Sequence, residues 1–157
     1  MGIRNNLRVG IAVVLFFYGL PLAPRSTGQG SRLAAAKTLR CSFPLTVVSA
    51  WKKDGQPDVV QKPATLVLRF DTIETDEGTA KLRNGSMESE IIARAADGYL
   101  HLMQSFRSGP MYVTTVFDKG PGGGKFKAVH SRHEYFDVPL AGATSSPEQY
   151  YGECEPN

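Results

Sequence analysis

The sequence predicts an all-β protein: a single antiparallel meander that closes into a small barrel, with a β-sandwich as the alternative. Segments in which apolar and polar residues alternate follow one another from residue 39 to near the carboxy terminus. Turn signals separate these segments, and none of the stretches between them has the apolar period of a helix. A meander of this length must hide its two edges, which closure into a barrel or folding into a sandwich achieves.

The first predicted strand covers residues 39–51, LRCSFPLTVVSAW. Six residues share one parity and form its predicted apolar face: Leu39, Cys41, Phe43, Leu45, Val47 and Trp51. Pro44 has no N–H to donate to a ladder, so it indicates an edge, a bulge or a bend within the strand. The polar run over residues 52–63 is then predicted to be a loop.

Further strands are predicted at short intervals after this loop. They cover residues 64–73, 79–83, 88–96, 99–106, 111–119 and 125–136. Asn84-Gly85 and Asp97-Gly98 favour two-residue hairpins, because both positions of such a turn need positive φ. Residues 139–149, PLAGATSSPEQ, are predicted to be an irregular crossover and not a linker to a second domain.

The first 28 residues are predicted to be a secretory signal peptide. Arg4 and Arg8 precede an apolar stretch over residues 9–23, which small and polar residues follow. A membrane anchor needs about 20 apolar residues, whereas this stretch is shorter and is interrupted by Gly19 and Pro21. We therefore expect export to the periplasm or the medium, with no stable membrane span after processing.

Processing is expected to leave a flexible mature N-terminus at residues 29–37 and one β-barrel-like domain at residues 38–157. Three of the 18 Lys and Arg residues precede residue 29, so the 15 that remain equal the 15 Asp and Glu residues. The mature chain is therefore neutral. It lacks the clustered excess of basic residues that nucleic-acid or anionic-membrane binding requires.

Two cysteines, Cys41 and Cys154, lie near the two ends of the mature domain. In an oxidising compartment an isolated pair is most simply a disulfide, and neither cysteine has the spacing of a metal-binding motif. Such a bridge would join the first strand to the last, which favours closure of the sheet.

The run FKAVHSRHEYF, residues 126–136, holds the candidate functional residues. His130 and His133 are three residues apart, so on a regular strand they point to opposite faces and cannot bind one metal ion. Parity places His130, Arg132 and Glu134 on one face with the aromatic residue that begins the run. If that face is internal, Arg132 needs a carboxylate or several carbonyls as partners.

A bulge at Ala128-Val129 is the alternative to a regular strand, and it would make Val129 and Tyr135 the core residues. The primary interpretation of the run is structural, as a hydrogen-bonded polar network near the barrel mouth or the terminal crossover. A site for a ligand is the second interpretation.

Two function classes remain open for the exported domain. The first is a binding or interaction module for a small molecule or an envelope protein, with His130, Arg132 and Glu134 as ligand-binding residues. The second is a small hydrolase or lyase in which His130 is the acid–base group and Arg132 and Glu134 orient it. The sequence carries no recognisable nucleophile motif, and no cofactor or metal is expected, so the first class is favoured.

The stretch FKAVHSRH and the ending SPEQYYGEC carry a resemblance. They are similar to the carboxy-terminal half of small exported proteobacterial proteins to which no function is assigned. This resemblance implies export, a bacterial origin and an all-β domain, and it transfers no site residue. The expected architecture also resembles that of membrane-bound lysozyme inhibitors, which are small exported barrels tied by a disulfide.

Overall fold

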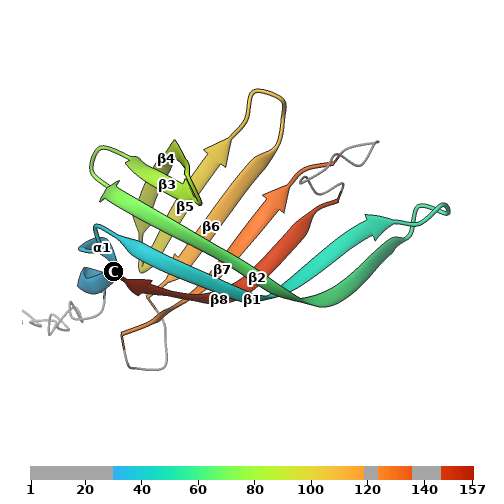
Figure 1. The fold of residues 1–157 in the computed structure, drawn as a ribbon, viewed down its shortest axis with the longest axis horizontal. Coiled ribbons are helices and arrows are strands. Elements are labelled where there is room, and N and C mark those ends of the chain that lie inside the picture. Colours follow the sequence, from blue (N-terminus) through green and yellow to red (C-terminus); the bar gives the residue numbers. More distant parts are fainter. Residues whose placement is uncertain (1–29, 119–123, 136–145) are drawn as a thin grey trace, which may run out of the picture.

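The structure, a computed structural model, describes residues 30–118, 124–135 and 146–157. The predicted signal peptide, residues 1–28, lies outside the described residues. Each strand pairs antiparallel with the next and the last pairs with the first, so the sheet is a closed barrel, as predicted, and not a sandwich (Figure 1). The strands are β1 (Leu39–Trp51), β2 (Pro57–Glu74), β3 (Thr79–Asn84), β4 (Met87–Ala96), β5 (Tyr99–Ser105), β6 (Met111–Phe117), β7 (Phe126–His133) and β8 (Glu148–Pro156).

β1 and β8 close the barrel, and the predicted disulfide lies on this seam. Cys41 of β1 is the register partner of Cys154 of β8, and a disulfide joins the two residues. Both cysteines are fully buried. Hydrogen bonds and a covalent bond therefore close the barrel at the same pair of strands.

A β-bulge in β1 corrects one predicted face. The register of β1 shifts between Phe43 and Leu45 against β2 and between Ser42 and Leu45 against β8, around Pro44, whose missing N–H interrupts the ladder. The shift reverses parity, so Thr46 is buried at 7% exposure, whereas Leu45 and Val47 are only partly buried. Trp51 is 57% exposed because it lies near the end of the hairpin, where both faces contact solvent. The predicted core face is therefore wrong for the residues beyond the bulge: Leu45, Val47 and Trp51.

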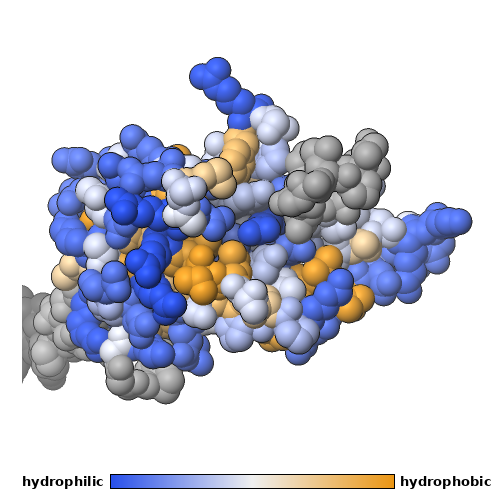
Figure 2. All heavy atoms as spheres, in the orientation of Figure 1, coloured by the Kyte–Doolittle hydropathy of each residue, from blue (hydrophilic) through white to orange (hydrophobic). Residues whose placement is uncertain are grey.

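The predicted polar loop at residues 52–63 is mostly strand, because β2 begins at Pro57 and leaves only a short turn after β1. Lys52 and Gln56 close this turn through a backbone hydrogen bond of 2.8 Å. The hairpin projects beyond the barrel as an arm, residues 50–58, at the right of Figure 1, past the last pairing of β1 with β8. Figure 2 shows a hydrophilic tip on this arm. Solvent contacts both faces of its outer part, so the polarity alternation that marks a half-buried strand is missing.

α1 (Gly30–Ala34) lies at the end of the barrel opposite the arm (Figure 1), within the segment predicted to be flexible. Leu33 is buried in the barrel core, and the guanidinium of Arg32 lies 5.6 Å from the ring centroid of Phe126. These contacts hold in place a segment whose composition alone indicates flexibility. In the part of the chain that the structure describes, no helix is long and apolar enough to cross a membrane.

Candidate functional site

β7 and the residue that follows it, Glu134, present the candidate residues to the barrel interior, as parity predicts. The strand pairs in continuous register with β6 and β8. His130 and Glu134 are 3% and 5% exposed, and the side chain of Arg132 is 19% exposed. The alternative with a bulge at Ala128-Val129 is wrong, since Ala128 is buried and Tyr135 is 63% exposed.

Two rows of inward side chains cross β6, β7 and β8. The first row is Thr114, His130 and Tyr150, and the second is Tyr112, Arg132 and Glu148. One end of the barrel carries the arm and the β5–β6 turn (Figure 1), and we refer to it as the open end. The second row lies nearer to this end than the first row does. His133 is exposed, so the two histidines of the run point to opposite faces as predicted.

His130 is an uncharged, hydrogen-bonded residue. Its Nδ1 lies 2.8 Å from Oγ1 of Thr114, and its Nε2 lies 3.5 Å from Nε of Arg132. Arginine only donates, so Nε2 is the acceptor and Nδ1 carries the ring proton, which it donates to Thr114. Burial, and then the positive charge of Arg132, lowers the pKa of His130 to about 3. The imidazole is therefore neutral at physiological pH.

Arg132 lies between two tyrosine rings. Its Cζ is 5.3 Å from the ring centroid of Tyr112 and 5.1 Å from that of Tyr150, which are cation–π distances. Nη1 lies 3.8 Å from Oε2 of Glu148, which supplies the carboxylate that an internal arginine was predicted to need. The two rings and the carboxylate restrict the position of the guanidinium.

Each tyrosine hydroxyl donates a hydrogen bond to a buried carboxylate. Tyr112 donates to Glu134 over 2.6 Å, and Tyr150 donates to Glu148 over 2.5 Å. Burial first, and the hydrogen bond to the carboxylate second, raises the pKa of each tyrosine to about 12. Glu134 therefore orients Tyr112, while Thr114 and Arg132 contact the ring nitrogens of His130. This arrangement differs from the enzymatic alternative, in which Glu134 would orient His130.

A cavity of about 200 Å³ lies beside this cluster at the open end. Its lining consists of Leu68, Leu82, Asn84, Met87, Ser89, Gln104, Phe106, Tyr112, His130 and Arg132. Met87 is 69% exposed and Phe106 is 36% exposed, so the cavity opens to solvent between the β3–β4 and β5–β6 turns. Apolar walls with a few convergent polar groups are typical of small-molecule sites, and barrel mouths are a common place for them.

The structure brings two of the three predicted ligand-binding residues to the cavity. His130 and Arg132 line it, whereas Glu134 and Glu148 do not belong to its described lining. Glu134 remains part of the cluster through Tyr112.

Sequence reasoning missed Tyr112, Thr114, Glu148 and Tyr150. The first two share a parity in the predicted strand 111–119, which was an available signal. The other two share the parity of Cys154, but the predicted crossover included the start of β8, so Glu148 was not placed on a strand.

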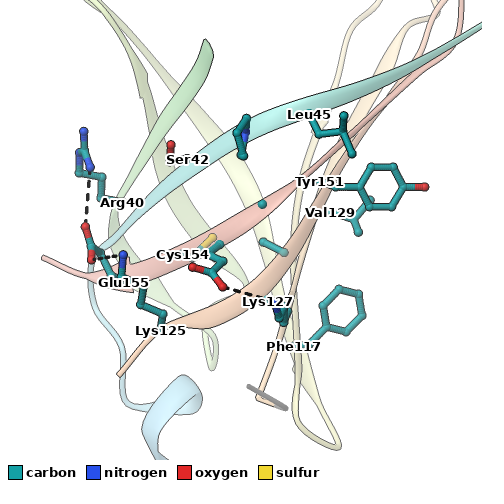
Figure 3. A pocket seen from close by; sticks show the side chains of 14 residues that line it. Arg40, Ser42, Leu45, Phe117, Lys125, Lys127, Val129, Tyr151, Cys154 and Glu155 are labelled. Carbon is teal, nitrogen blue, oxygen red and sulfur yellow. Dashed lines mark hydrogen bonds and ion pairs between the residues drawn. The ribbon is translucent and has the colours of Figure 1, made fainter. Parts of the chain in front are cut away.

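A larger groove of about 700 Å³ runs over the outer face of β1, β7 and β8 (Figure 3). Its charged end holds two sets of ion pairs. Arg40 and Lys125 lie 3.7 and 3.6 Å from Glu155, and Lys127 lies 3.3 Å from Glu153. These side chains are exposed, so each ion pair contributes little free energy. The interior cavity, with its buried polar residues, is the stronger candidate.

Comparisons with protein-family models, with curated proteins and with solved structures found no match for this chain. Among the described residues, no three His, Cys, Asp or Glu side chains are grouped to hold a metal ion. The function is therefore inferred from the chemistry of the cavity and its polar cluster.

Proposed function

We propose that the protein is an exported binding module that holds a small molecule in the cavity at the open end of its barrel. The convergence of His130 and Arg132 on a cavity open to solvent carries this proposal. Burying an arginine and a histidine costs folding free energy, and apolar side chains of similar volume often give a more stable interior. Polar groups that carry such a cost are common at ligand sites.

Binding explains the cluster better than catalysis does. A histidine with a pKa of about 3 carries no proton to donate as an imidazolium at neutral pH. Its acceptor nitrogen Nε2 already faces Nε of Arg132. Both features suit a neutral, fixed wall of the cavity and not an acid–base group.

Export is the second part of the proposal. The apolar segment at residues 9–23 supports it, and the Cys41–Cys154 disulfide is typical of proteins in oxidising compartments. The intact mass of the exported protein should lack approximately residues 1–28. A full-length species held in the membrane would contradict this part.

Filling the cavity tests the first part. Ser89 of β4 lines the cavity, whereas the next residue, Glu90, is exposed on the other face of the strand. Ser89→Phe should occupy the cavity, and Glu90→Phe is the matched control on the same strand. The probes are benzene, benzyl alcohol, benzoate and benzylamine at millimolar concentration, and binding is followed by amide NMR shifts.

We expect at least one probe to shift the amides around His130 in the wild type and in Glu90→Phe, but not in Ser89→Phe. The proposal is refuted if no probe shifts these amides, or if Ser89→Phe binds the probes as the wild type does.

A further inference from the structure

We infer that the ligand carries a single carboxylate, which Arg132 binds, on a body no larger than one ring or a short branched chain. This inference rests on the proposed function, because it names the ligand of the same cavity. Four features of the described residues lead to it: the unused donors of Arg132, its restricted position, the position of the glutamates and the size of the cavity.

Arg132 has donors to spare. A guanidinium carries five N–H groups. Nε faces His130 at 3.5 Å, and Nη1 faces Glu148 at 3.8 Å, which is longer than a hydrogen bond. Within the described residues, Oδ2 of Asp118 is the one fully buried side-chain polar atom without a hydrogen-bond partner. No nitrogen of Arg132 is both fully buried and without a partner, so its unused N–H groups remain accessible.

Two tyrosine rings restrict the position of these donors. The Cζ atom of Arg132 lies at cation–π distance from both Tyr112 and Tyr150, so the guanidinium has little freedom to move. A planar fork held in place matches a carboxylate, which accepts two parallel hydrogen bonds. The hydroxyls of both tyrosines already donate to glutamates, so they do not compete for the ligand's oxygens.

Neither buried glutamate belongs to the lining of the cavity. Glu148 borders a second hollow, next to Val47 and Val59 of the β1–β2 hairpin, and Arg132 lines both hollows. Within the cavity a ligand meets the cation of Arg132 and the neutral ring of His130. Because Glu148 offsets part of the charge of Arg132, we expect recognition by direct hydrogen bonds to one carboxylate and weak binding of dianions.

The size of the cavity limits the rest of the ligand. A cavity of about 150 Å³ with apolar walls accommodates benzene. The cavity here is about 200 Å³, and Leu68, Leu82 and Phe106 supply apolar walls above Arg132. One aromatic ring with a carboxylate fits this space and this distribution of polarity.

Three of the probes share one ring and differ in charge, so they test the inference directly. Benzoate should bind wild-type protein at least about tenfold more tightly than benzyl alcohol, and benzylamine should bind most weakly. Arg132→Met should remove this preference and leave the affinity for benzyl alcohol within about threefold. Arg69→Met, at an exposed position on the outer face of β2, should change neither affinity.

Arg132→Lys is the second variant, and it allows the inference to be tested if Arg132→Met does not fold. Lysine keeps the charge but loses the planar fork, so the preference for benzoate should fall by at least about threefold. Equal affinities for benzoate and benzyl alcohol in the wild type, or an unchanged preference in Arg132→Lys, would overturn the inference. Ser89→Phe distinguishes failure of this inference from failure of the proposed function. If this variant blocks binding of the neutral probe benzyl alcohol, the proposed function stands even when benzoate is not preferred.

Discussion

His130 occupies a position where burial decides its charge. Its ring packs against Phe43, Tyr112 and Tyr150, with centroid separations of 5.9, 6.0 and 5.8 Å. These rings exclude water, and the nearby guanidinium of Arg132 repels an imidazolium. His130 therefore acts as a neutral wall of the cavity, and its protonation is coupled to folding.

Stability should depend on pH through His130. The folded-state pKa is about 3 and the ordinary value is 6.5, so the unfolded state binds more protons between these two pH values. The free energy of unfolding therefore falls as pH is lowered through this window, by at most about 1.4 kcal/mol per pH unit. Urea unfolding at several pH values measures this slope.

His130→Gln should have a flatter slope than the wild type in the same window, because the group that titrates is gone. His133→Gln removes an exposed histidine and is the matched control, with the slope of the wild type. Equal slopes in all three proteins would show that burial does not lower the pKa of His130.

Gly152 is needed where two backbones approach each other. A Cβ at this position would lie 2.0 Å from the carbonyl oxygen of Ser42 and 2.8 Å from Cα of Phe43. Gly152→Ala should lower the free energy of unfolding by at least about 3 kcal/mol, because β1 must move away at its bulge. Gly85→Ala, at a turn with φ of 60° and open space around it, should cost only about 1 kcal/mol. Chemical denaturation compares the two, and equal losses would contradict this account.

The strand elements show how one bulge redirects a whole segment. Before the bulge Phe43 faces the core, and after it Thr46 does, although the two have opposite parity in the sequence. Trp51, at the end of the same strand, lies in solvent. Phe43→Ala should therefore cost about 3–5 kcal/mol, whereas Trp51→Ser should change stability by no more than about 0.5 kcal/mol. Denaturation midpoints test this contrast. Comparable losses of stability in the two variants would contradict this account and support the predicted face shared by Phe43 and Trp51.

The arm and the adjoining part of β2 carry an unpaired strand edge. β2 pairs with β3 only from Arg69 onward, so residues 57–68 have β1 on one side and an open edge on the other, among the described residues. Lys52 and Gln56 form a hydrogen-bonded pair, and along the hairpin such pairs alternate with pairs that are not hydrogen-bonded. Pro57 and Pro63 fall in the pairs that are not hydrogen-bonded, so their backbone nitrogens point to the open edge. Prolines at an edge remove donors and discourage pairing with other chains.

For the whole molecule, the disulfide is the main covalent constraint. It closes a loop with a sequence separation of 113 residues, which the chain-entropy model values at about 4–5 kcal/mol. The double variant Cys41→Ala/Cys154→Ala should lose about that much stability in urea unfolding. Reduced wild-type protein should show a similar loss. A loss below about 1 kcal/mol would show that hydrogen bonding between β1 and β8 is sufficient to close the barrel.

Much of the fold could be predicted because it depends on local patterns. Alternation predicted the strands, and the Asp97-Gly98 hairpin signal was confirmed by positive φ at both residues. The other hairpin turns at Gly85-Ser86, one residue later than predicted: Gly85 has positive φ, and Asn84 is paired in β3. The closed barrel and the disulfide followed from strand order and cysteine position. The arm was missed because neither of its outer faces is buried, so the polarity pattern of a half-buried strand was not there to detect.

The candidate site divides in the same way. Parity within one strand determined that His130, Arg132 and Glu134 share the interior face, because neighbouring side chains of a strand alternate by covalent geometry alone. Only the tertiary structure decided that Tyr112 and Tyr150 clamp Arg132 and that a cavity lies beside it. Those contacts depend on the register of β6, β7 and β8, which barrel closure and core packing set between residues far apart in the chain.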